Sequence, residues 1–137
     1  MQFAQLCDLV ESDAAAGPID PHALLGVWVN SNPEADGIAR LIVSDTDGQL
    51  SAQVYAIGPN GLIDWGQADV APLASAVTSR VGGGFTCSYD FGFAETRLQG
   101  MLAKGLLVLA EFHSFKDNSK RAPYFVREYF ALAQSPF

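Results

Sequence analysis

A two-residue alternation of apolar and polar side chains, broken at short intervals by turn-forming residues, runs through the chain from Gly26 onward. Alternation of this kind turns one side of a strand toward a core and the other toward water, so it is typical of antiparallel sheets. Residues 45–48, 59–61 and 104–105 have the composition of tight hairpin turns. The expected strands cover residues 26–31, 38–45, 49–57, 62–71, 76–81, 85–91, 94–102, 106–115 and 123–132.

Eight or nine short strands without an intervening helical pattern predict an all-β sandwich or barrel. Consecutive hairpins favour an antiparallel up-and-down barrel, because closure removes exposed strand edges. The 137 residues fit one domain, which we divide into a leading segment over 1–23 and a barrel over 24–133. Two further elements are expected in the leading segment. One is a short amphipathic helix with Phe3, Leu6, Cys7 and Val10 on one face that ends near Gly17, and the other is a single turn opened by Asp20 and Pro21.

The composition argues against several classes of partner. The net charge is −7, and residues 1–39 hold six acids and no Lys or Arg, which disfavours binding to nucleic acid. The longest apolar run, residues 106–110, is too short for a membrane-spanning helix, so no membrane partner is expected. Two cysteines, Cys7 and Cys87, do not form a disulfide framework, and we therefore expect a cytoplasmic protein.

Gly26, Trp28 and Arg127 predict a barrel closed at one end. The indole on the first strand would fill the floor, and the guanidinium on the last strand would stack on its face. A barrel closed in this way implies a cup with a ligand inside it.

The last hairpin sets the expected register. With a loop at residues 116–122, Glu111 lies opposite Arg127 and His113 lies opposite Phe125. A slip of one residue would oppose Glu111 to Glu128, a like-charge pair that costs stability, so the first register is preferred. The side chains then expected inside the barrel are Leu107, Leu109, Glu111, His113, Phe115, Phe125 and Tyr129. The inverse assignment, which places Glu111 and His113 on the surface, stays open.

In the preferred register, the opposite face of the same hairpin is too apolar to be left in water. It carries Leu106, Val108, Ala110, Phe112, Tyr124, Val126, Phe130 and Leu132. This face predicts a cover, either the N-terminal helix or a second subunit in a homodimer.

A second inward wall is expected on strand 85–91, which carries Phe85, Cys87, Tyr89 and Phe91 on one face. Gly92 then kinks the chain, so that Thr96, Leu98 and Leu102 point inward on the next strand. Residues 82–84, three consecutive glycines, lack the context of a phosphate loop and predict a hairpin hinge.

His113, Glu111 and Tyr89 are the candidate catalytic residues. A histidine beside a carboxylate on an inner wall can act as a general acid or base. The alternatives are a histidine at the rim without a chemical role and a glutamate that only pairs with Arg127. The candidate ligand-binding residues are Tyr55, Trp65, Phe85, Phe91, Leu109, Phe125 and Tyr129. Two histidines and two cysteines at unrelated positions predict no metal site.

Gly26-Val27-Trp28, together with Arg127 on the last strand, resembles the lipocalin-like (calycin) barrels. Residues 28–38, Asp64-Trp65-Gly66, residues 90–93 and residues 128–130 are also similar to a group of uncharacterised bacterial barrel proteins, over most of residues 24–132. Intracellular bacterial barrels of this shape include carriers and cofactor-free cyclases of polyketide-type natural products, and the resemblance implies the same choice here.

Three functions follow as expectations. The first is a cofactor-free cyclase or isomerase of bacterial secondary metabolism that acts on a hydrophobic, polyketide-like molecule in the barrel, where proximity alone can lower a barrier by about 7–11 kcal/mol. The second is a non-catalytic protein that binds a hydrophobic small molecule. The third is a structural or interaction barrel whose interior is filled by side chains, because a barrel of about eight strands is only just wide enough for a ligand.

Overall fold

A computed structural model describes residues 17–133, which form nine antiparallel strands and one 3-10 turn. The all-β, up-and-down fold expected from the sequence is confirmed. The elements are η1 (His22–Leu24), β1 (Gly26–Asn30), β2 (Ile38–Thr46), β3 (Gln49–Gly58), β4 (Gly61–Asp69), β5 (Ala71–Ala74), β6 (Gly82–Asp90), β7 (Ala94–Ala103), β8 (Leu106–Phe115) and β9 (Tyr124–Leu132).

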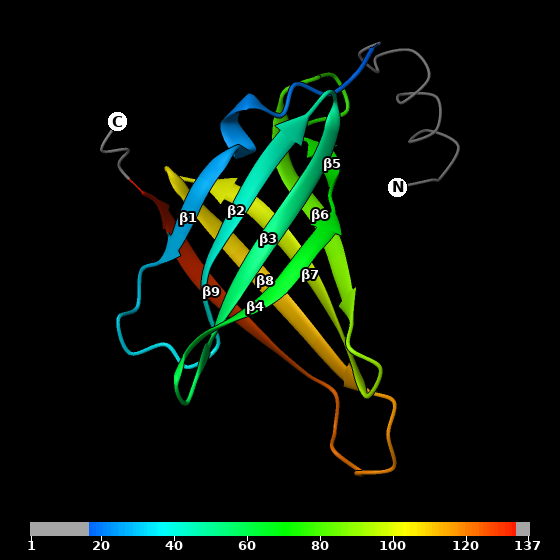
Figure 1. Cartoon of the computed structure of the whole chain (residues 1–137). Helices are drawn as coiled ribbons and strands as arrows, with labels where there is room; N and C mark the ends of the chain where they lie inside the picture. Colours follow the sequence, from blue (N-terminus) through cyan, green and yellow to red (C-terminus); the bar gives the residue numbers. More distant parts are fainter. Residues whose placement is uncertain (1–16, 134–137) are drawn as a thin grey trace, which may run out of the picture.

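The strands form one sheet in the order β4-β3-β2-β1-β9-β8-β7-β6-β5 that curls into a nearly closed barrel (Figure 1). β1 joins the two halves of the sheet, because it pairs with β2 on one side and with β9 on the other. η1 lies at one end of the barrel, and the long loop between β8 and β9, drawn in orange, extends from the other end (Figure 1). We call this second end the open end.

The core fills the half of the barrel nearest η1. Trp28 is 3% exposed, and its Nε1–H donates to the carbonyl oxygen of Leu24 at 2.9 Å. Leu24 itself is fully buried beneath the barrel wall. Phe85 and Phe130 are also fully buried, so large side chains from β1, β6 and β9 meet in this half. The interior of this half is therefore occupied by closely packed side chains.

The barrel closes between β4 and β6 through a side chain instead of a strand ladder. The Tyr89 hydroxyl on β6 lies 3.1 Å from the carbonyl oxygen of Ala52 and 2.9 Å from that of Gly66. Its ring lies edge-on to Trp65 on β4, with ring centroids 5.5 Å apart. Tyr89 therefore joins β6 to β3 and β4 at the one seam that main-chain pairing leaves open.

The prediction of a strand at residues 76–81 is wrong. The edge strand β5 is Ala71–Ala74, and the chain then turns through residues 75–81. The Ser79 hydroxyl accepts the N–H of Val81 at 3.0 Å, and the N–H of Ser75 bonds to the carbonyl of Val81. Because a serine side chain takes a main-chain donor here, the segment closes into a loop and does not extend a ladder.

Residues 82–84 are not a hinge, as was expected, but the first residues of β6. A Cβ added at Gly84 would lie 2.6 Å from the carbonyl oxygen of Gly100, and one added at Gly82 would lie 2.8 Å from that of Asp20. Only glycine permits main chains to approach this closely, so these residues are part of the barrel wall.

The register expected for the last hairpin is wrong by one residue. Glu111 lies opposite Val126, and Ala110 lies opposite Arg127. The strand assignment therefore reverses on β9: Tyr124, Val126, Glu128 and Phe130 share the inner face, and Phe125, Arg127 and Tyr129 lie on the outer face.

Arg127 consequently does not stack on Trp28, and the prediction that it closes the floor of the barrel is wrong. Its side chain is exposed beside Val108 and Ala110 in an outer groove of the sheet. The pairing of the fully buried Phe130 with the fully buried Leu107 explains the true register, because the expected register would turn Phe130 outward.

The inward faces expected for the other strands agree with the burial pattern. Phe85, Cys87 and Tyr89 are buried on β6, and Thr96 and Leu98 are buried on β7. The 3-10 turn also forms at the expected place, with the Asp20 carboxylate accepting the N–H of His22 at 3.0 Å. The expected N-terminal helix lies outside the described residues, and within residues 17–133 no helix could cross a membrane.

We predict that Tyr89→Phe lowers the free energy of unfolding by about 1–2 kcal/mol, because it removes the one O–H donor that lies within hydrogen-bond distance of two carbonyls at the seam. Tyr129→Phe is the matched control, since Tyr129 is 45% exposed on the outer face, and it should change stability by less than about 0.5 kcal/mol. Urea denaturation of the two variants measures both values. Equal effects would show that the seam does not depend on the hydroxyl.

Candidate functional site

Two adjoining cavities lie at the open end of the barrel, and both are lined by Trp65, His113 and Tyr124. The first cavity has a volume of about 350 Å³ and contains the carboxyl groups of Glu111 and Glu128. We call it the polar cavity. The second has a volume of about 430 Å³, and we call it the aromatic cavity because its wall includes Phe91, Phe93 and Phe115 as well.

Glu111 and Glu128 form a buried carboxyl pair in the polar cavity. In the β8–β9 pairing, Glu128 lies opposite Leu109, and Val126 lies opposite Glu111. Glu128 and Val126 are two residues apart and therefore share the inner face of β9. The Glu111 side chain is only 2% exposed and lies between Leu98 on β7 and Val126 on β9. Burial, followed by the hydrogen bond and the negative charge of Glu128, raises the pKa of Glu111 to about 9. Glu111 is therefore a neutral carboxylic acid at pH 7.

Asn30 holds the second carboxyl group in place. Its Nδ2 donates to Glu128 Oε1 at 3.2 Å and to the carbonyl of Ile38 at 2.9 Å, so the amide is fixed from both sides. Gly37 leaves space beside the pair: a Cβ there would lie 3.7 Å from Glu128 Oε2 and 4.0 Å from Glu111 Oε1. Two buried oxygens, Glu111 Oε2 and Glu128 Oε2, have no hydrogen-bond partner among the described residues.

His113 faces the carboxyl pair from the same strand as Glu111. Its Nε2 lies 3.6 Å from Glu111 Oε1, and its Nδ1 lies 2.9 Å from the hydroxyl of Thr96, which is buried. Burial lowers the pKa of His113, against the opposite effect of the Glu128 charge. The imidazole is therefore neutral at pH 7 and can accept a proton.

Trp65 reaches the open end through a bulge in β4. Gly66 has a φ of +83°, and its N–H is accepted by Asp64 Oδ1 at 2.7 Å. The β3–β4 register shifts at this point, so the Asp64-Trp65-Gly66 segment is a bulge within a strand. The indole then packs edge-on against Phe91, with ring centroids 5.0 Å apart.

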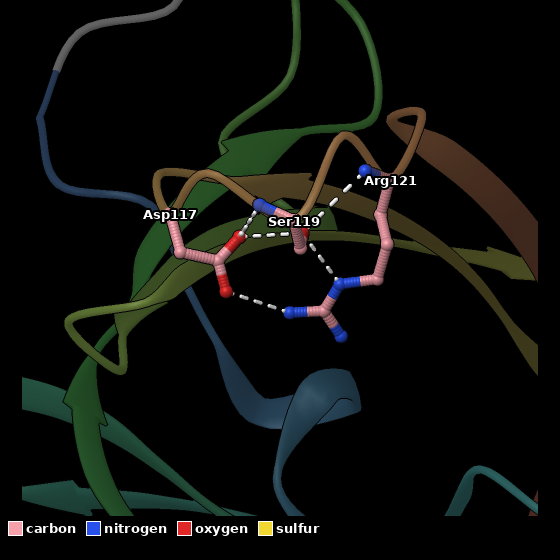
Figure 2. Close-up of polar contacts among 3 residues, drawn as sticks. All are labelled: Asp117, Ser119 and Arg121. Atoms are coloured by element: carbon pink, nitrogen blue, oxygen red, sulfur yellow. Dashed lines mark hydrogen bonds and ion pairs between the residues drawn. The ribbon is translucent and has the colours of Figure 1, made fainter.

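The loop between β8 and β9 is held in shape by polar contacts among Asp117, Ser119 and Arg121 (Figure 2). Arg121 Nη2 donates to Asp117 Oδ2 at 2.9 Å, and Arg121 Nε donates to the Ser119 hydroxyl at 2.8 Å. The Ser119 hydrogen bond, followed by weaker contributions that include Arg121, lowers the pKa of Asp117. The Arg121 guanidinium lies 4.0 Å from the ring centroid of Phe115, so the loop covers part of the aromatic wall.

The structure brings together only part of the expected site. Glu111 and His113 are adjacent, and Trp65 and Phe91 line the cavities beside them. Phe85 and Leu109 are fully buried in the core. Tyr89 belongs to the seam and lines neither cavity.

Three expected ligand-binding residues lie outside the barrel, and their assignment to its interior is wrong. Phe125 is 70% exposed and Tyr129 is 45% exposed, because the observed register of β9 turns both side chains to the outer face. Tyr55 alternates with the buried Val54 and Ala56 on β3, and Arg40 lies over its ring at 4.7 Å.

Sequence reasoning missed Glu128, Asn30 and Tyr124 as site residues. Glu128 was recognised only as a like-charge neighbour that Glu111 would avoid, which assumed that both groups are ionised. Tyr124 stacks on His113 with ring centroids 4.7 Å apart, and its place follows from the same register as Glu128. Asn30 carries no signal in the sequence, because its partners lie on β2 and β9.

We predict that wild-type stability falls as the pH rises from 6.5 to 8.5. The folded protein keeps a proton on Glu111, with its pKa of about 9, that the unfolded chain has lost, so unfolding is favoured at higher pH by up to about 1.4 kcal/mol per pH unit. Glu111→Gln should remove most of this slope, and Asp69→Asn, an exposed carboxyl remote from the pair, should keep it. Urea denaturation at three pH values gives the slopes. A slope in Glu111→Gln equal to that of the wild type would contradict a neutral Glu111.

The fold agrees with a lipocalin-like barrel in its general form, a nearly closed antiparallel barrel of nine strands over residues 17–133. No protein-family model, curated protein or solved structure matched the chain. Within the described residues, no group of three or more His, Cys, Asp or Glu side chains is arranged to hold a metal ion.

Proposed function

We propose that the protein is a cofactor-independent enzyme that transfers a proton on an apolar small molecule bound at the open end of the barrel. The observation that carries the proposal is the carboxyl pair, in which a neutral acid on Glu111 lies beside the carboxylate of Glu128 and 3.6 Å from the His113 ring. Groups whose environments push their pKa values apart can serve as an acid and a base at the same pH.

The proposed reaction needs a base and an acid. Glu128, oriented by Asn30, or the neutral His113 removes a proton from the substrate. Glu111 returns a proton to a neighbouring atom and so stabilises the charge that develops there. Thr96 fixes the ring orientation of His113, as a positioning residue should.

The aromatic cavity supports an apolar substrate. Trp65, Phe91 and Phe93 form an apolar wall in the cavity that His113 also lines. A cavity of about 430 Å³ lies within the range of small-molecule sites. An isomerase or a cyclase acting on a polyketide-like molecule in bacterial secondary metabolism is the specific form of the proposal. A cytoplasmic location and a homodimer stay predictions.

A non-catalytic binding protein is the second candidate, and the aromatic cavity favours it. Such a protein would use the same wall of rings and would not need the proton held on Glu111. The filled-barrel alternative applies to the half nearest η1, where Trp28, Phe85 and Phe130 occupy the interior. The cavities at the open end are the reason to prefer a ligand-binding function.

We predict that the protein accelerates exchange of α-hydrogens in bicyclic aromatic ketones such as β-tetralone, measured by NMR in D₂O. Glu128→Gln and His113→Ala should each lower the exchange rate at least tenfold, which is a moderate value for one acid–base group. Asp69→Asn is the control outside the cavities and should exchange at the wild-type rate. Binding followed through Trp65 fluorescence separates lost affinity from lost proton transfer.

Ketones that quench the Trp65 signal but exchange no faster than in buffer would favour the binding protein over the enzyme. Exchange that persists unchanged in both the Glu128 and the His113 variants would contradict the assignment of the acid–base groups.

A further inference from the structure

The polar cavity carries an unbalanced negative charge. Its described lining includes Asp36, Glu111 and Glu128 but no Lys or Arg. With Glu111 neutral and Glu128 charged, the buried pair holds one proton and a net charge of −1. Asn30 donates a hydrogen bond to this charge but brings no positive charge of its own. A buried charge of this kind is costly unless a cation pairs with it.

Apart from the one proton that the pair holds, two of its oxygen atoms have no hydrogen-bond partner within residues 17–133. Glu111 Oε2 and Glu128 Oε2 are both buried and unpartnered among the described residues. The Glu111 side chain is only 2% exposed. Gly37 leaves open space within 4.0 Å of both carboxyl groups. A ligand group with several N–H donors would satisfy oxygens that the protein leaves unsatisfied.

The wall shared with the aromatic cavity suits a positive charge as well. Trp65 and Tyr124 line both cavities, so a group held near Glu128 has aromatic faces beside it. Indole and phenol rings attract cations through their electron-rich faces. A carboxylate at the same place would meet three acids and is therefore disfavoured.

We propose that the molecule bound at the open end is an arylalkylamine in its protonated form, with the ammonium group on the Glu111–Glu128 pair and the ring in the aromatic cavity. The proposal rests on the proposed function only in using the same cavities. It replaces the wholly apolar substrate assumed there with a ligand that carries one positive charge beside an aromatic ring. The ammonium supplies the positive charge and the N–H donors that the pair lacks.

Binding of a cation should be linked to the titration of Glu111. The titratable groups that face it are Glu128 on β9, His113 on β8, Asp36 before β2 and Tyr124 on β9. An ammonium favours the ionised form of Glu111, so binding releases a proton and the affinity rises with pH below about 9. His113 stays neutral above pH 6.5 because its pKa is lowered. A neutral ligand that accepted a hydrogen bond from the Glu111 acid would show the opposite trend.

We predict that phenethylamine binds the wild-type protein at least tenfold more tightly than 2-phenylethanol at pH 7, and that 3-phenylpropanoate binds most weakly, as measured by isothermal titration calorimetry. The amine affinity should rise between pH 6.5 and 8.5. Glu128→Gln should lower the amine affinity at least tenfold and the alcohol affinity less than threefold. Asp69→Asn removes one negative charge from an exposed position and should leave all three affinities unchanged.

Equal affinity for amine and alcohol, tighter binding of the carboxylate, or an amine affinity that falls with pH would each overturn the proposal. Unfolding curves of Glu128→Gln confirm that the variant is folded. Glu111→Gln keeps the charge of Glu128 but has no proton to release, so its amine affinity should no longer rise between pH 6.5 and 8.5. Amine binding without hydrogen exchange on any ketone would refute the enzyme and leave this inference standing. Exchange without amine binding would refute the inference alone.

Discussion

The pairing of β8 with β9 is the constraint on which the open end of the barrel depends. Phe130 is fully buried opposite the equally buried Leu107, and this contact holds β9 in one of two possible registers. Because side chains alternate every residue, a shift of one position would turn Phe130 and Glu128 outward and Arg127 inward. The carboxyl pair, the stacking of Tyr124 on His113 and the exposure of Arg127 all follow from this one choice.

The sequence allowed most of the architecture to be predicted, because the signals are local. Hairpin turns at residues 45–48, 59–61 and 104–105 lie where the composition places them, and the aromatic inner face of β6 follows from simple alternation. The candidate site was only half accessible. Glu111 and His113 share one strand and one face, whereas Glu128 depends on a register across the loop at residues 116–123, where counting residues does not decide the pairing.

The missing information about Glu128 was chemical as well as geometric. Placing two glutamates on one inner face is unfavourable only if both are ionised, and here a single proton makes the pair compatible with burial. The role of Tyr89 was inaccessible for a different reason. Its hydroxyl bonds to carbonyls on β3 and β4, and only the closed sheet shows that these strands lie across the seam from β6.

Packing alone does not explain a carboxyl group at position 111. Its cross-strand neighbours are Leu98 and Val126, and the next inward residue on β8 is the fully buried Leu109, so an aliphatic side chain would fill the same space. Glu111 instead leaves one buried oxygen unpartnered and lowers the stability of the fold as the pH rises toward 9. Polar groups that reduce stability in this way concentrate where proteins bind or transform a ligand. The half of the barrel nearest η1 shows the contrast, because its interior holds Trp28, Phe85 and Phe130 in close packing with the single indole donor satisfied. The open end is therefore the part of this barrel where stability is given up, which is why we propose the ligand site there.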